Sequence, residues 1–115
     1  SDRLATARRW IAAATAAGRS PDAALVDATA ARGTDAGRLG GTGATVDWKA
    51  VAAAVDLGMP LVLAGGLTTA NVAEAIAVSG AKAVDTASGV ESAPGVKDPK
   101  KLRDFVAAAA RALRL

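Results

Sequence analysis

Two pairs of small residues in this chain follow apolar stretches, and residues placed there could bind an anion. Gly65 and Gly66 stand in the segment LVLAGGL, and Ser88 and Gly89 end the segment AVDTASG. A phosphate oxygen must come within about 3 Å of a backbone N–H to bind it, and a residue with little or no side chain allows that approach. If the two segments are neighbouring parallel strands, the loops at their carboxyl ends can share one phosphate. The alternative is that each pair forms a tight strand-to-helix turn.

An acid and a glycine-rich segment stand where they could take part in the same chemistry. Asp27 lies near the end of the apolar segment AALVDA, and an aspartate there either acts as a general acid or base or forms a turn or helix cap. The segment 31–43 includes Gly40, Gly41 and Gly43. Its length suggests function rather than mere connection, although a flexible turn explains its glycines equally well.

The elements that must position these residues alternate along the chain, from a first helix to a last helix with three strands between. The strands are too apolar to have one face in water, which is typical of a parallel sheet covered by helices. Helices are expected at 2–17, 47–58, 69–79 and from 98 onward, and strands at 23–28, 60–67 and, with the loop that follows it, 81–89. We therefore expect a single α/β domain over 1–115.

Other acids are better explained by helix geometry than by chemistry. Asp47 and Asp98 each precede a predicted helix and are expected to cap it, and Asp98 is followed by a proline in the preferred order. Glu91 is a loop acid without an assigned role. The last helix should bury one stripe, formed by Leu102, Phe105, Val106, Ala109 and Leu113.

Composition excludes several classes of protein. The 115 residues are 51% hydrophobic and only 3% aromatic, which fits one globular unit rich in closely packed helices. Cysteine and histidine are both absent, so we expect no disulfide, metal site or cofactor. The net charge of +3 is dispersed, without the basic stripe and stacking residues of a nucleic-acid surface. No apolar run approaches the roughly 20 residues of a membrane span, and the first residues lack a signal-peptide core, so cytoplasm is the expected location.

Four segments together resemble one enzyme family. ALVDA, GGTGATVDW, LVLAGGLTTANVAEAI and AVDTASGVESAPGVKD, in this order, resemble the C-terminal half of phosphoribosylanthranilate isomerase over about residues 1–110. That family catalyses an Amadori rearrangement in tryptophan biosynthesis, in a (β/α)8 TIM barrel. The resemblance implies that the strands here are the sixth, seventh and eighth of the barrel and that the first helix is the fifth. The expected fold is thus the parallel-sheet half of such a barrel.

The resemblance also implies roles for particular residues. Asp27 falls on the general acid that protonates the ribose ring oxygen, and partial burial would help to keep its carboxyl protonated. Asp85 either lines the top of the barrel or bonds a neighbouring loop, and we favour the second, structural role. The glycines and serine match two kinds of loop: phosphate-binding loops at Gly65, Gly66, Ser88 and Gly89, and a mobile loop over the substrate at Gly40, Gly41 and Gly43.

The chain departs from the family's pattern in what it does not contain. The resemblance places the general base, a cysteine, on the first strand and an arginine for the anthranilate carboxylate in the same half, and this chain has no cysteine. Three strands cannot close an eight-stranded barrel. We expect the missing part to be in another chain, cleaved or removed, so that the chain alone is inactive.

Two functions from different classes follow. In the first, the chain supplies the acid and the phosphate loops of an isomerase acting on a phosphorylated small molecule, once an N-terminal half-barrel completes it. In the second, it is a non-catalytic, phosphate-binding half-barrel that associates with itself or with a partner. A companion polypeptide with a cysteine at a strand end would favour the first function. A homodimer without such a companion would favour the second.

Overall fold

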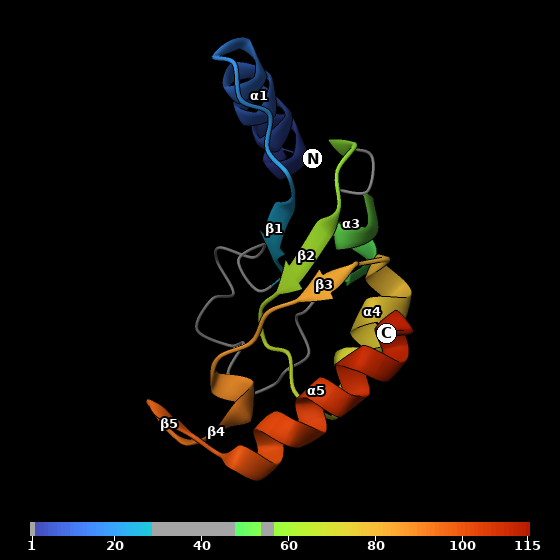
Figure 1. Ribbon diagram of the computed structural model, residues 1–115. Coiled ribbons are helices and arrows are strands. Elements are labelled where there is room, and N and C mark those ends of the chain that lie inside the picture. Colours follow the sequence, from blue (N-terminus) through green and yellow to red (C-terminus); the bar gives the residue numbers. More distant parts are fainter. Residues whose placement is uncertain (1, 29–47, 54–56) are drawn as a thin grey trace.

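A three-stranded parallel sheet forms the centre of the molecule (Figure 1). The computed structural model describes residues 2–28, 48–53 and 57–115. Strands β1 (Ala24–Asp27), β2 (Leu61–Ala64) and β3 (Ala83–Val84) lie side by side in the order β1-β2-β3. The predicted parallel sheet is confirmed, although each strand is shorter than the apolar segment that contains it.

Helices flank and connect the strands, and all but the first cover one face of the sheet (Figure 1). They are α1 (Asp2–Ala16), α3 (Trp48–Ala52), α4 (Val72–Ser79) and α5 (Pro99–Leu113). Helix α4 packs against both α3 and α5. Helix α1 lies beyond the end of the sheet at which the strands begin, so it is far from the end toward which the arrows of β1 and β2 point (Figure 1).

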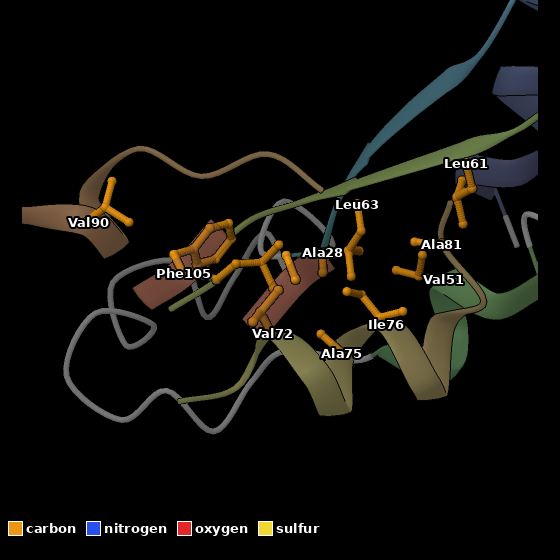
Figure 2. Close-up of a cluster of buried hydrophobic side chains, with 12 residues drawn as sticks. Ala28, Val51, Leu61, Leu63, Val72, Ala75, Ile76, Ala81, Val90 and Phe105 are labelled. Carbon is orange, nitrogen blue, oxygen red and sulfur yellow. The ribbon is translucent and has the colours of Figure 1, made fainter. Parts of the chain in front are cut away.

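The core lies between the sheet and this helical layer. Leu61 and Leu63 of β2 point toward α4, where Val72, Ala75 and Ile76 meet them (Figure 2). Leu63, Val72 and Ala75 are fully buried. Burying an aliphatic side chain contributes about 1.5–3 kcal/mol, so this contact is a main source of stability for the described part of the chain.

The C-terminal end of α4 and the start of α5 lie at the residues that the sequence predicted for them. Asp98 is extended and caps α5, because its Oδ1 accepts hydrogen bonds from the N–H groups of Lys100 (2.8 Å) and Lys101 (3.1 Å). Gly80 ends α4 in the left-handed region with φ 75°, where glycine is favoured. Asp47, the other predicted cap, lies outside the described residues.

The end of the chain differs from the prediction in two respects. A short 3-10 turn, η3 (Ser88–Val90), and an antiparallel hairpin of β4 (Glu91–Ala93) and β5 (Val96–Lys97) precede α5. The predicted stripe on α5 is only partly right, because Phe105 and Ala109 are buried whereas Leu102 and Val106 are 44% and 57% exposed. Leu102 and Val106 are four residues apart, so they are neighbours on the helix surface.

Candidate active site at the carboxyl edge of the sheet

The carboxyl ends of the three strands bring two carboxylates to one face of the sheet. Asp27 pairs with Ala64 across β1 and β2, and Leu63 pairs with Val84 across β2 and β3. Asp85 continues β3, because its N–H donates to the Leu63 carbonyl at 2.9 Å. Side chains alternate between faces along a strand, so Asp27, Ala64 and Asp85 share the face opposite the helical layer.

Both carboxylates on this face are exposed. Their strands are separated by β2, so the two Cα atoms lie roughly 10 Å apart at about 4.8 Å per strand. The expected partial burial of Asp27 is therefore wrong for this chain. The reason is topological: the helices cover the other face, where Val26 packs against the core. The favoured structural role of Asp85 is not seen, because its exposed side chain makes no hydrogen bond to a neighbouring loop within the described residues.

The loop after β2 is shaped by its two glycines. Gly65 and Gly66 have φ angles of 101° and 68°, in the left-handed region that a residue with a Cβ rarely adopts. The Asn71 side chain then fixes the loop from within: its Oδ1 accepts from the Thr68 N–H at 2.8 Å, and its Nδ2 donates to the Gly66 carbonyl at 3.0 Å. The alternative that this pair forms a tight turn is thus correct as far as it goes, and it leaves a role toward an anion open.

The loop after β3 is packed directly against the loop after β2. The Thr86 hydroxyl donates a 2.7 Å hydrogen bond to the Leu67 carbonyl, across 19 residues of sequence. A Cβ at Gly89 would collide with that same carbonyl oxygen and would lie 2.8 Å from the Thr86 hydroxyl. Close contact between the two loops is therefore a sufficient reason for glycine at this position. From the sequence, Gly89 was predicted to bind a phosphate, and Thr86 had no predicted role.

The hairpin braces the loop after β3 from the other side. Lys97 Nζ donates to the Ala87 carbonyl at 3.0 Å and to Glu91 Oε2 at 2.8 Å. Glu91 Oε1 also accepts from the Gly95 N–H at 3.2 Å. The hydrogen bond from Lys97, with that from Gly95, lowers the pKa of Glu91 from its ordinary value of 4.5. Glu91, which had no assigned role, thus ties the hairpin to the loop, and the turn residues Pro94 and Gly95 were the signal that could have predicted it.

Several backbone donors at this edge have no acceptor among the described residues. The hydrogen bonds of the described part of the chain use the N–H of Thr68 but not those of Gly66, Ser88 and Gly89. Backbone N–H groups gathered at the carboxyl edge of a parallel sheet are the usual means by which such folds hold a phosphate. The edge therefore brings these backbone N–H groups together with the carboxylates of Asp27 and Asp85.

Three glycines proposed for the substrate loop, Gly40, Gly41 and Gly43, lie outside the described residues. Within 2–28, 48–53 and 57–115, no group of three or more acidic side chains is placed to hold a metal ion. No helix in these same ranges is long and apolar enough to cross a membrane.

Comparison with known proteins gives a consistent family. A sequence model of the family N-(5'phosphoribosyl)anthranilate (PRA) isomerase matches residues 8–108. The N-(5'-phosphoribosyl)anthranilate isomerase of Ruegeria sp. (strain TM1040) is 52% identical over 88 residues, which are 76% of this chain and 40% of the relative. The enzyme of Rhodopseudomonas palustris (strain BisB18) is 44% identical over 88 residues, 76% of this chain and 39% of that relative.

Solved structures of the same enzyme share the fold. The phosphoribosyl anthranilate isomerase of Thermotoga maritima superposes with a TM-score of 0.58 at 33% identity, over 77% of this chain and 50% of that chain. Another, solved in complex with reduced 1-(o-carboxyphenylamino)-1-deoxyribulose 5-phosphate, gives a TM-score of 0.56 at 35% identity, over 77% of this chain and 47% of that chain.

The chain spans about 40% of the length of the curated relatives it matches and about half that of the solved structures. The family model nevertheless covers most of the chain, and the α/β fold with its parallel sheet is that of the matched structures. This chain belongs to the N-(5'-phosphoribosyl)anthranilate isomerase family.

Proposed function

We propose that this chain supplies the general acid and the phosphate-binding loops for the isomerisation of N-(5'-phosphoribosyl)anthranilate to the 1-deoxyribulose phosphate product. The observation that carries the proposal is the common edge shared by Asp27 and the N–H groups of Gly66, Ser88 and Gly89, which have no acceptor within the part of the chain that the structure describes. A related structure is in complex with a ligand that ends in a 5-phosphate, which is the kind of group these donors suit.

The proposed chemistry gives each group at this edge a separate task. The loops after β2 and β3 hold the phosphate, which fixes the ribose above the face of the sheet opposite the helical layer, here called the open face. Asp27 donates a proton to the ribose ring oxygen, and the carbon–oxygen bond opens to leave a Schiff base. A base then removes the C2′ proton to give the enolamine. Asp85, level with Asp27 on the same face, lines the site next to the reacting sugar.

The base must come from outside this chain, because the family resemblance calls for a cysteine and the chain contains none. We therefore infer that the strands are the sixth to eighth of a barrel and that the chain is inactive until the remaining strands are supplied. Two unpaired apolar regions support this inference: Leu25 on the open face is 65% exposed, and Leu102 and Val106 form an exposed flank on α5. The remaining strands and helices of a barrel would cover both, and would shield Asp27 from water.

A second function is favoured by the same open face. A half-barrel with an exposed Leu25 could cover that face with a second copy of itself and bind phosphate without catalysis. The two proposals differ in the catalytic role of Asp27, since only the first needs a transferable proton there.

The test is a substitution in the chain assembled with a segment that supplies the missing strands. Asp27→Asn keeps the shape of the side chain but removes the proton, so turnover should fall by about 10²–10⁴-fold. Asp22→Asn, at an exposed aspartate just before β1, is the matched control and should keep normal turnover. If Asp27→Asn also retains normal turnover while the assembly is active, Asp27 is not the general acid, and Asp85 is the next candidate.

A further inference from the structure

A side-chain hydrogen bond joins the loops after β2 and β3. Thr86 immediately follows Asp85 at the end of β3, and its partly buried hydroxyl donates to the carbonyl of Leu67, directly after the Gly65-Gly66 turn. The Leu67 side chain is 1% exposed and anchored in the core, so its carbonyl is a fixed point rather than a mobile loop atom. The hydroxyl therefore fastens the start of the second loop to a rigid part of the first.

The second loop meets the same carbonyl again three residues later. The side-chain position at Gly89 is closed by the Leu67 oxygen, so the chain passes this atom with its backbone in contact. Thr86 and Gly89 thus approach one acceptor from both sides of the loop. A loop held at two points around one fixed atom has its two intervening residues, Ala87 and Ser88, in defined positions.

The first loop is fixed independently by Asn71, which bonds to Thr68 N–H and the Gly66 carbonyl. Because the Asn71 side chain is bonded to both groups, neither is free for a ligand. The Gly66 N–H has no acceptor among the described residues. Within the described ranges, however, the Asn71 side chain bonds only to its own loop and not to the loop after β3. The contacts of Thr86 and Gly89 with the Leu67 carbonyl therefore set the relative position of the two sets of N–H donors.

We propose that Thr86 is a positioning residue for the phosphate site: its hydroxyl sets the spacing between the donors of the loop after β2 and those of the loop after β3, so that both sets bind the same anion. This inference rests on the proposed function, since it assigns a further residue to the same site. The hydroxyl does not touch the phosphate. By holding the loops in place before the anion binds, it reduces the conformational entropy that the loops would otherwise lose on binding.

The experiment is a titration of the chain with inorganic phosphate and, separately, ribose 5-phosphate, followed by backbone amide NMR signals. Thr86→Val removes the donor but keeps the branched shape, and should weaken phosphate binding by about five- to tenfold, as expected for losing one hydrogen bond. Thr86→Ser keeps the hydroxyl and should restore most of the affinity. Thr15→Val, which removes a hydroxyl from a 3.2 Å contact with Ser20 far away at the end of α1, should bind phosphate as tightly as the unsubstituted chain.

The outcomes separate the inference from the proposed function. If the unsubstituted chain shifts the amide signals of Gly66, Ser88 and Gly89 and Thr86→Val does so with equal affinity, the role of Thr86 is refuted while the phosphate site stands. If phosphate shifts none of these signals in the unsubstituted chain, the phosphate site itself is refuted and the role of Thr86 falls with it. A purely structural Thr86 would lower the melting temperature of Thr86→Val but leave phosphate affinity unchanged in the folded fraction.

Discussion

Replacing Gly89 by alanine tests the packing of the two loops most sharply. The φ of Gly89 is outside the left-handed region, so an alanine there meets no backbone strain. Its Cβ would instead collide with the Leu67 carbonyl oxygen, and it would lie 3.0 Å from the carbonyl carbon and 2.8 Å from Thr86 Oγ1. The carbonyl belongs to a fixed backbone, so relief requires the loops to separate and the hydrogen bond from Thr86 to break.

The expected cost follows from these two effects. Overpacking in a fixed environment costs about 1–3 kcal/mol, and losing one hydrogen bond costs about 1 kcal/mol. Gly89→Ala should therefore lower the free energy of unfolding by about 2–4 kcal/mol.

Urea unfolding followed by tryptophan fluorescence, at one fixed protein concentration, measures this change. The matched control is Gly95→Ala, because Gly95 has φ 79° and nothing within 4 Å of its added Cβ. That variant meets backbone strain without a collision and should cost about 1–2 kcal/mol. The reasoning is refuted if Gly89→Ala is no more destabilising than Gly95→Ala.

Three further predictions concern acid stability, the last helix and assembly. Because the folded-state pKa of Glu91 lies below 4.5, its contact with Lys97 stabilises the fold above that pH and is lost as the pH falls through the lowered pKa. In urea unfolding at a series of acidic pH values, Glu91→Gln should reduce this fall in the free energy of unfolding. An unchanged fall would contradict the prediction. Asp98→Ala removes the cap of α5 and should cost about 1 kcal/mol in the same assay, whereas no loss would mean that the two capping bonds are replaced by water. The chain alone should associate, with a scattering mass that rises with concentration, because Leu25 is exposed on an open sheet face; a concentration-independent monomer with a cooperative thermal transition would oppose this.

Much of the fold was predictable because local signals and periodicity determined it. The alternation of apolar segments with amphipathic ones predicted the parallel sheet, and Asp98 followed by proline predicted the start of α5. The stripe on α5 was only half right, because periodicity identifies an apolar face but not whether the chain contains a neighbour for all of it. Leu102 and Val106 belong to a flank for which the described residues supply no cover.

The position of the candidate residues in the fold was predictable, but the contacts that hold their loops together were not. Asp27, the Gly65-Gly66 pair and the Ser88-Gly89 pair were assigned to one edge of the sheet from strand order, and the register places them there. The contact of Thr86 with Leu67 was not predictable, since it joins residues 19 apart through a loop geometry that no local pattern encodes. The exposure of Asp27 also escaped prediction, because it depends on which elements cover that face of the sheet, and a position at a strand end does not indicate this.

The most direct test of the proposed function is turnover of N-(5'-phosphoribosyl)anthranilate, with product measured by chromatography, in three samples of equal concentration. These are the chain alone, a complementary segment that supplies the remaining barrel strands alone, and the two together. The proposed function predicts the 1-deoxyribulose phosphate product only in the mixture, because the acid and phosphate loops lie in one part and the base in the other. A mixture that forms a folded complex yet makes no product, or a chain that makes product by itself, would contradict it.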